Sequence, residues 1–440
     1  MQLTRLDLKK EDIPELIRTL RGVPGEDEEL RGQVGGIIER VRRDGDRALV
    51  ELTREYDCPD FQERMLKVPS EEIEAAALAA PEELIEAFRM AAENIRLFHQ
   101  HEMRGSWTAS MRHSQMLGQR MIPVDRAGLY VPGGGAAYPS TVLMTVIPAQ
   151  VAGVKEIFIC TPPDSEGRVN RAVMAAAGML GVTEMYRVGG AQAVAAMAYG
   201  TETIRGSDVI VGPGNVYVTE AKRQVFGRVG LDSLAGPSEV VIIASVSAQA
   251  DLVAADLLAQ VEHGSGAIAV LVCPSSDFAD SVEAELLGLA DELGIDEAKL
   301  GNISIVIGDG PEFIPLAIAF SNAFAPEHLQ IHTEHPEQEI HEITAAGAVF
   351  LGEDVCTAYG DYIAGSNHVL PTAGTARFGS ALSVENFLRK VAVISLIPTA
   401  ITELTPSLLT IARTEGLVAH ARAAELRLEK FGLPLEEEED

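Results

Sequence analysis

Ala127-Gly-Leu-Tyr130-Val-Pro132-Gly-Gly-Gly135 joins an apolar run to three consecutive glycines, and this pattern indicates the fold class. The apolar run is typical of a buried strand, and a long helix is predicted from about residue 140 to residue 154. The same succession of strand, glycine loop and helix recurs further along the chain. Strands that alternate with helices form right-handed βαβ units, so we predict a parallel sheet.

Two alternating series are predicted, which makes the chain α/β with two doubly wound parallel-sheet domains. After residue 154, the first series has strands at 156–161, 184–188 and 208–211 and helices at 171–180 and 191–199. The second series has strands at 239–244, 267–273, 303–308, 329–333 and 348–351 and helices at 248–262, 277–293 and 336–346. At 440 residues the chain is too long for one ordinary core, which agrees with two domains.

The remaining segments lie outside the two series. Residues 1–24 are predicted as an N-terminal arm or a short helix. The first domain is predicted over 25–236, with a helical lead-in at 25–103 and a strand excursion of two strands at 104–126. The second domain is predicted over 237–376. A C-terminal helical tail is predicted over 377–440, with a short strand at 391–397 and a long helix at 407–431.

Composition and charge exclude some classes of partner and site. The formal net charge of -30 disfavours binding to nucleic acid or to anionic membranes through bulk charge. The four cysteines are far apart and form no CxxC pair, which favours a reducing compartment without disulfides. The N-terminus lacks the apolar core of a signal peptide, and no apolar segment is long enough to span a bilayer. We therefore expect a cytoplasmic protein.

Glycine loops follow the strands of the first series, at the carboxyl ends where parallel sheets bind ligands. They are Gly133–Gly135, Gly189-Gly190 and Gly212–Asn215, and none has the G-x-G-x-x-G fingerprint of a dinucleotide site. The loops are therefore either tight turns or a nucleotide site of a non-standard kind. The polar side chains at the loop mouths that would contact a nucleotide are Tyr130, Gln192 and Asn215.

Glu327 and His328 are the candidate acid/base pair, in the stretch Ala325-Pro-Glu-His-Leu329. A proline pushes the residue before it out of the helical region, so we expect the pair on an exposed loop just ahead of a strand. Both side chains can accept a proton, and histidine titrates closest to neutral pH. The alternative is a surface glutamate beside a half-buried histidine.

A candidate metal site is indicated by three further stretches. Gln260 and His263 are three residues apart and share one face of a helix. Asp361 lies in a glycine-flanked loop after the last strand, which we expect at a carboxyl end, with Asn367 and His368 as orienting neighbours. Nitrogen and oxygen donors of these types suit Zn²⁺. The spacing is not HExxH, however, and the alternative for each histidine is a purely structural role.

The terminal helix carries the third stretch, Glu415-Gly-Leu-Val-Ala-His420. With it, eight motifs occur in the order found in the histidinol dehydrogenase family, and the chain resembles that family over nearly its whole length. The motifs are Gly128–Gly134, Gly189–Ala193, Gly212–Asn215, Ala235–Val240, Gln260–His263, Ala325–Leu329, Gly360–Pro371 and Glu415–His420.

The resemblance implies a homodimeric enzyme with NAD and one Zn²⁺ per subunit as cofactors. Such an enzyme oxidises L-histidinol through L-histidinaldehyde to L-histidine, in the final steps of histidine biosynthesis, and uses two NAD⁺. The family's subunit has two large Rossmann-like domains. The resemblance also implies that small N-terminal and C-terminal dimerisation elements cross to the partner.

Residue by residue, the resemblance implies roles in the site. Glu327 and His328 match the acid/base pair, and Tyr130, Gln192 and Asn215 match nucleotide contacts. The positions that match zinc ligands are Gln260, His263, Asp361 and His420 of the partner subunit. The positions that match substrate contacts are Ser238, His328 and Glu415, together with the four metal ligands.

Two alternatives stay open from the sequence. A relative in the same superfamily would oxidise another polar alcohol, such as sulfopropanediol, with the same zinc and Glu-His machinery. The presence of both Glu415 and His420 favours histidinol over that substrate. A non-catalytic nucleotide- or metal-binding protein on the same fold is disfavoured by the intact pair of Glu327 and His328.

Overall fold

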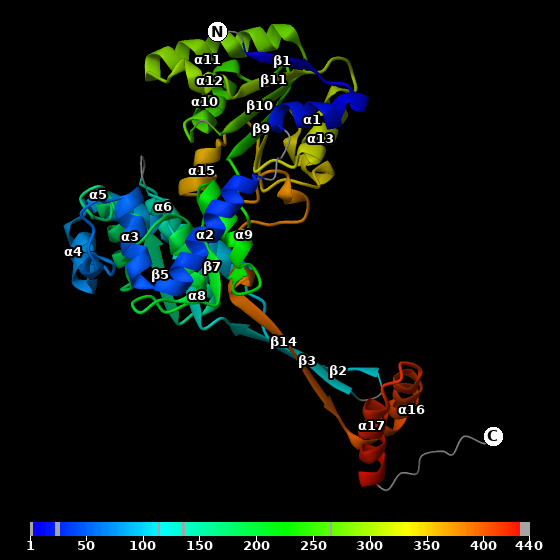
Figure 1. Cartoon of the computed structure of the whole chain (residues 1–440). Helices are drawn as coiled ribbons and strands as arrows, with labels where there is room; N and C mark the ends of the chain where they lie inside the picture. The colour runs from blue at the N-terminus through cyan, green and yellow to red at the C-terminus, as the bar shows by residue number, and fades with distance from the viewer. Residues whose placement is uncertain (1–2, 23–26, 113–114, 134–136, 265, 432–440) are drawn as a thin grey trace. The chain divides into compact units, whose positions relative to one another are not determined.

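The computed structural model describes residues 3–22, 27–112, 115–133, 137–264 and 266–431 (Figure 1). The chain divides into two compact units. The first comprises Met1–Glu102 and Val124–Phe387 and contains two parallel sheets. The second comprises Met103–Pro123 and Leu388–Asp440 and contains an antiparallel sheet and two helices. None of the helices in the described ranges is long and apolar enough to cross a membrane.

The first parallel sheet has five strands in the order β6-β5-β4-β7-β8. Its strands are β4 (Arg126–Tyr130), β5 (Glu156–Thr161), β6 (Met185–Arg187), β7 (Val209–Val211) and β8 (Gly230–Leu231). The helices along this part of the chain are α6 (Pro139–Ala152), α7 (Arg171–Met179), α8 (Gly190–Tyr199) and α9 (Val216–Val225). The predicted alternation of strand and helix in the first series is therefore confirmed.

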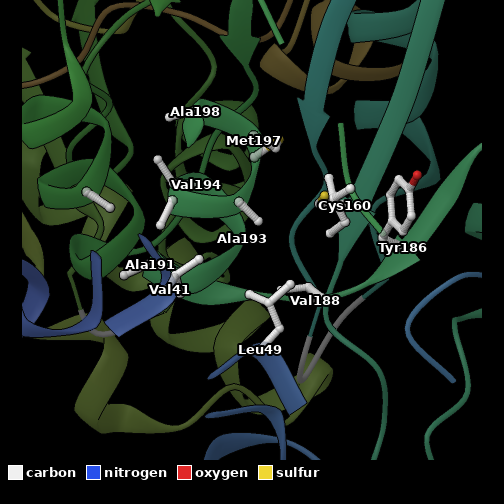
Figure 2. Close-up of a cluster of buried hydrophobic side chains, with 14 of the residues drawn as sticks. Val41, Leu49, Cys160, Tyr186, Val188, Ala191, Ala193, Val194, Met197 and Ala198 are labelled. Carbon is white, nitrogen blue, oxygen red and sulfur yellow. The ribbon is translucent and has the colours of Figure 1, made fainter. Parts of the chain in front are cut away.

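Helices precede this sheet along the chain, as predicted for the helical lead-in. They are α2 (Glu28–Asp44), α3 (Asp46–Tyr56), α4 (Ser70–Ala79) and α5 (Glu82–His101), with the 3-10 helix η2 (Glu63–Met65) between α3 and α4. Val41 of α2 and Leu49 of α3 share one buried core with Val188 and Ala191 at the start of α8 (Figure 2). The apolar stripes of α2 and α3 thus pack with α8 on one face of the first sheet.

The second parallel sheet has six strands in the order β1-β11-β10-β9-β12-β13. They are β1 (Thr4–Asp7), β9 (Glu239–Ala244), β10 (Ile268–Cys273), β11 (Ile303–Ile307), β12 (His328–His332) and β13 (Ala348–Leu351). The helices of this part are α1 (Ile13–Arg21), α10 (Ala250–Val261), α11 (Ser276–Leu293), α12 (Glu297–Leu300), α13 (Phe313–Phe324), α14 (Pro336–Glu339) and α15 (Thr357–Tyr362). Short 3-10 helices lie at Lys10–Asp12, Ile340–Glu342, Thr375–Arg377 and Val384–Phe387.

The second sheet is covered on both faces, as expected of a doubly wound domain. Leu257 of α10 and Leu271 of β10 belong to the core on one face. Phe320 of α13 and Leu329 of β12 belong to the core on the other face. The five strands predicted for the second series are confirmed, and their continuous apolar runs are explained by this burial on both sides.

The N-terminal arm contains the short helix that its sequence allowed, α1, and a strand that its sequence pattern did not reveal, β1. β1 pairs in parallel with β11, and α1 packs against α13 (Figure 1). β1 has only four residues, and its two ends are exposed. Such a short edge strand has no continuous apolar run, so its position in the sheet is fixed by tertiary pairing alone.

The second unit contains a three-stranded antiparallel sheet in the order β14-β3-β2. Its elements are β2 (Trp107–Ser110), β3 (Gln115–Pro123), β14 (Leu388–Leu396), α16 (Pro398–Thr414) and α17 (Val418–Lys430). The predicted pair of strands at 104–126 is confirmed as β2 and β3. The short strand predicted near residue 391 is confirmed as β14, which pairs with β3 over its full length.

The single long helix predicted at 407–431 is wrong. The chain breaks between α16 and α17 at Gly416, whose φ of 74° lies in the left-handed region. The two helices then pack on each other through Leu409 and Ala421. An isolated glycine is compatible with a continuous helix, so the sequence pattern did not distinguish a hairpin from one helix.

We expect the second domain to lose stability when the buried core next to the candidate site is truncated. Leu271→Ala in β10 removes a side chain that is 0% exposed and should lower the free energy of unfolding by about 2–5 kcal/mol. Leu287→Ala in α11 is the matched control, because Leu287 is 38% exposed and the same truncation leaves no closed cavity. Urea unfolding of both variants checks this, and equal losses would contradict the assigned core.

Candidate active site

The candidate acid/base pair lies at the amino-terminal edge of the second sheet. β12 begins at His328 and β9 begins at Glu239, and the two strands pair in parallel with His328 opposite Val240. α10 connects β9 to β10, so its last turn returns Gln260 to this same edge. The sequence predicted Asp361 in a loop at a carboxyl end of the sheet, and this prediction is wrong. Asp361 lies near the end of α15, a helix that follows β13 and runs back to the amino-terminal edge.

Glu327 is held by two hydrogen bonds to one carboxylate oxygen. The Ser238 hydroxyl donates to Glu327 Oε2 over 2.6 Å, and the backbone N–H of Glu239 donates to the same atom over 2.8 Å. His328 Nδ1 lies 3.6 Å from that oxygen and 3.2 Å from the backbone carbonyl oxygen of Glu239. The exposed loop predicted for this pair is wrong, because Glu327 is only 7% and His328 only 4% exposed.

The turn before the pair is a strained backbone segment. Ala325 ends α13 with a φ of 51°, in the left-handed region that side chains other than glycine seldom adopt. The backbone carbonyls of Pro326 and Glu327 accept hydrogen bonds from the N–H groups of Gly347 and Ala348. The loop is therefore tied to the start of β13, and it directs Glu327 and His328 inward instead of toward solvent.

Burial and neighbouring charges shift the pKa values of the pair. Burial raises the pKa of Glu327, and the charge of His328 and the two hydrogen bonds offset this only in part. Burial by itself lowers the pKa of His328, but the charges of Glu327 and Asp361 outweigh it and raise that pKa above its usual value. Both directions make the two side chains stronger bases than their exposed counterparts.

Asp361 lies beside the other nitrogen of the His328 ring. Its Oδ1 atom is 3.4 Å from His328 Nε2, which is buried and makes no hydrogen bond of good geometry. The Asp361 carbonyl oxygen accepts a hydrogen bond of 2.9 Å from Nδ1 of His368. Burial raises the pKa of the Asp361 carboxyl, but the nearby imidazoles of His328, His368 and His263 outweigh it and lower that pKa. Asp361 is therefore an ionised carboxylate among imidazoles.

The three metal ligands expected from this chain lie at the same edge but differ in exposure. Gln260 is 3% exposed and its Nε2 atom has no hydrogen-bond partner, whereas His263 is exposed just beyond α10. A half-turn of the Gln260 amide would present its oxygen instead, an atom that binds cations. Within the described ranges, no three His, Cys, Asp or Glu side chains are grouped to hold a metal ion. The donors Gln260, His263 and Asp361 therefore suit Zn²⁺ only if a further ligand completes the set.

The candidate nucleotide contacts lie at the carboxyl edge of the first sheet. The backbone N–H of Gly190 donates to the Tyr130 hydroxyl over 3.0 Å, and a Cβ at Gly190 would lie 2.8 Å from Oε1 of Gln192. Tyr130 and Gln192 are both buried, and burial raises the pKa of Tyr130 to about 12. The structure thus brings these two predicted side chains together. Gly134 and Gly135 lie outside the described residues.

The loop Gly212–Asn215 is fixed from both ends. Asn215 is exposed, and its Oδ1 accepts hydrogen bonds of 3.1 Å from the first N–H groups of α9, so it serves as the helix N-cap. Lys222 donates to the carbonyl of Gly212 over 3.0 Å and to the carboxylate of Asp232. Asp232 in turn accepts a hydrogen bond of 2.7 Å from the N–H of Gly212.

The buried pair of Lys222 and Asp232 was not predicted from the sequence. A signal was present, because Lys222 lies on the apolar face of α9, next to the buried Ala221 and three residues before the buried Val225. A lysine at such a position is rare unless it is paired. Its partner, Asp232, lies ten residues later in a loop whose sequence shows no hydrophobic periodicity that would predict its burial.

Glu415 and His420 belong to the second unit. Glu415 lies in the turn between α16 and α17, and His420 lies in the first turn of α17. Both side chains are exposed.

Comparisons with known proteins identify the relatives of this chain. A family model described as histidinol dehydrogenase matches residues 23–428. Histidinol dehydrogenase of Thermosynechococcus vestitus is 48% identical over 413 residues, which cover 92% of this chain and 94% of the relative. That of Geobacillus kaustophilus is 49% identical over 406 residues, with 92% and 95% covered. The crystal structure of histidinol dehydrogenase from Elizabethkingia anophelis matches with a TM-score of 0.89 and 36% identity, and covers 98% of this chain and 99% of that one.

Removal of the Lys222 ammonium should destabilise the first domain. Lys222→Met leaves Asp232, whose side chain is 2% exposed, as an uncompensated buried charge, at a cost of about 3–5 kcal/mol in the free energy of unfolding. Arg223→Met on the same helix breaks an exposed ion pair and should cost less than about 1 kcal/mol. Lys222→Met/Asp232→Leu should regain much of the loss. Urea unfolding compares the three, and a loss in the double variant equal to that in Lys222→Met would argue against a buried ion pair.

Proposed function

The chain belongs to the histidinol dehydrogenase family, and we propose on that basis that it oxidises L-histidinol through L-histidinaldehyde to L-histidine, with NAD⁺ as the oxidant. Membership of the family makes it an oxidoreductase of histidine biosynthesis. The observation that carries the proposed mechanism is the buried pair of Glu327 and His328 beside the ionised Asp361. Such a pair is costly to bury and is typical of acid/base chemistry.

His328 is the base that takes the hydroxyl proton of the alcohol. Its Nδ1 atom faces the backbone carbonyl of Glu239, which only accepts hydrogen bonds, so Nδ1 carries the hydrogen in the neutral ring. Nε2 then carries the free lone pair, and it is the buried ring atom that has no hydrogen-bond partner. NAD⁺, when bound, would supply the acceptor for the hydride of the carbon that bears this hydroxyl. A base is needed because the carbon gives up its hydride only if the hydroxyl proton is taken.

Glu327 is the residue that activates water for the second oxidation. The aldehyde must add water before its carbon can lose another hydride. Ser238 and Glu239 hold one oxygen of the Glu327 carboxylate, so the other oxygen is the one to take a proton from that water. Because burial raises the pKa of Glu327, its carboxylate is a stronger base than an exposed glutamate.

The donor set at the edge of the second sheet supports a zinc site shared between two copies. Gln260, His263 and Asp361 would hold the ion together with His420 of the partner subunit. Zn²⁺, when bound, would hold the imidazole of the substrate in place. Ser238 and Glu415 are proposed to contact the substrate as well, and Tyr130, Gln192 and Asn215 to contact the nucleotide.

A homodimer is supported by the apolar surface of the second unit. Side chains of β14 and of the two terminal helices that would be buried in an ordinary core are exposed instead. They are Val391, Val393, Ile394, Leu396, Ile397, Leu408, Ile411, Leu417, Val418 and Leu426. An exposed apolar surface of this kind marks an interaction site, and we propose that a second copy of the chain covers it.

Loss of the proposed base should abolish turnover without loss of the ion. His328→Asn should lower kcat for L-histidinol by about 10²–10⁴-fold, because proton abstraction is lost. NADH formation is measured with L-histidinol and, in parallel, with sulfopropanediol. Zinc content per chain should equal that of the wild type. If the wild type oxidises the sulfonated diol but not L-histidinol, the proposed substrate is wrong. If kcat is unchanged in His328→Asn, His328 is not the base.

Shared sites should show in mixed dimers. His420→Ala should lose zinc and activity, as should His263→Ala, whereas His341→Ala, at another exposed histidine, should lose neither. When equal amounts of His420→Ala and His328→Asn chains are dissociated and reassembled, half of the dimers contain one intact site. About a quarter of the wild-type activity should then return. No recovery in dimers shown to be mixed would mean that each copy completes its own site.

A further inference from the structure

Arg21 and Glu239 form a buried ion pair next to the acid/base residues. Nε and Nη2 of Arg21 donate to the two carboxylate oxygens of Glu239 over 2.8 and 2.6 Å. The side chain of Glu239 is 2% exposed and that of Arg21 is 14% exposed. Two parallel hydrogen bonds fix both the distance and the orientation of the carboxylate, which a single contact would not do.

Glu239 is also the residue whose backbone holds both members of the acid/base pair. Its N–H donates to Glu327, and its carbonyl oxygen faces Nδ1 of His328. The side chain of Glu239 thus points to Arg21 while its two backbone groups point to the site. A rotation at Glu239 would move both backbone groups at once.

Arg21 makes a second contact, with the aromatic ring of the last residue of α13. Its guanidinium carbon lies 3.8 Å from the centre of the Phe324 ring, at the end of α13. The next residue, Ala325, turns the chain in the left-handed region toward Glu327. Arg21 therefore bridges the start of β9 and the end of α13, which are the two segments that converge on Glu327 and His328.

The backbone around this bridge is strained. Among the described residues other than glycine, only Ala325 and Ala373 have a positive φ, at 51° and 53°. Ala325 follows the stacked Phe324, and Ala373 lies near the Glu239 carboxylate. A Cβ at Gly374 would lie 2.6 Å from Nη1 of Arg21. Strained residues persist only where the surroundings hold them, and here the common neighbour is the Arg21–Glu239 pair.

We propose that Arg21 is a positioning residue for the reaction, which holds Glu327 and His328 in register through Glu239 and Phe324. The proposal rests on the proposed function in that Glu327 and His328 are taken as the acid/base pair. Arg21 lies before residue 23, where the match to the family model begins. The N-terminal segment, which has no group in the site, thereby controls the site's geometry.

The role requires arginine and not merely a positive charge. Lysine would keep the charge but lose the second hydrogen bond and the stacking on Phe324. Arg21→Lys and Arg21→Met should therefore both lower kcat for L-histidinol, by about 10- to 100-fold, because small displacements of a base are that costly. KM should change less than kcat, since Gln260, His263 and Asp361 lie on other elements and only Ser238 and His328 among the proposed substrate contacts adjoin Glu239. Arg18→Met is the matched control on α1, because Arg18 pairs only with the exposed Glu15.

A double variant separates positioning from simple stabilisation. Arg21→Met leaves the Glu239 carboxylate buried without its cation, so the thermal midpoint should fall as well as kcat. In Arg21→Met/Glu239→Gln the buried charge is gone, so the midpoint should recover while kcat stays low. Recovery of kcat together with the midpoint would mean that Arg21 contributes only to folding, and would overturn the proposal. A kcat within about twofold of the wild type in Arg21→Met would overturn it too.

Hydrogen exchange tests the same idea without any turnover. The amide of Glu239 is hydrogen-bonded to Glu327, so its exchange reports how firmly the start of β9 is held. Exchange in a peptide covering residues 237–244 should be about tenfold faster in Arg21→Met and in the double variant, and unchanged in Arg18→Met. If the wild type fails to oxidise L-histidinol but exchange responds in this way, the proposed substrate fails and the positioning role stands. Unchanged exchange in Arg21→Met removes the role whatever the substrate.

Discussion

The burial of the Glu327 carboxylate is the constraint on which the arrangement around the second sheet depends. A buried carboxylate is tolerated only where hydrogen bonds and opposite charge replace its lost hydration. Ser238 and the N–H of Glu239 supply the hydrogen bonds, and His328 supplies the charge. These groups come from the starts of β9 and β12, which are neighbours in the sheet. The parallel pairing of the two strands therefore assembles the acid/base pair and compensates its burial at the same time.

The candidate site residues lie at opposite edges of the two sheets. In the first sheet, Tyr130 and Gly190 follow the carboxyl ends of strands, which is the usual place for ligands in a doubly wound domain. In the second sheet, Glu327 and His328 lie at the amino ends, and Gln260 reaches that edge because its helix runs antiparallel to the strands. Each edge thus carries the candidate groups that the local chain direction delivers there.

Buried ion pairs fix the backbone next to both edges. The pair of Lys222 and Asp232 holds Gly212 at the edge of the first sheet, and the pair of Arg21 and Glu239 holds the start of β9 at the edge of the second. Lys222 reaches the backbone of a loop, whereas Arg21 reaches the carboxylate of the first residue of β9. Burying such charges contributes little net stability, but it allows few alternative positions for the loop.

The sequence by itself determined the two series of parallel strands, because continuous apolar runs separated by glycine loops and helices have few other solutions. It also singled out Glu327, His328 and Asp361, whose residue types suit acid/base and metal chemistry. Only the tertiary structure decided that Glu327 and His328 are buried at the amino-terminal edge of the second sheet, and that the terminal helix breaks at Gly416. It alone joined Arg21 to Glu239, which are 218 residues apart. Periodicity records which face of an element is apolar, whereas a single long-range contact leaves no periodic trace in the chain.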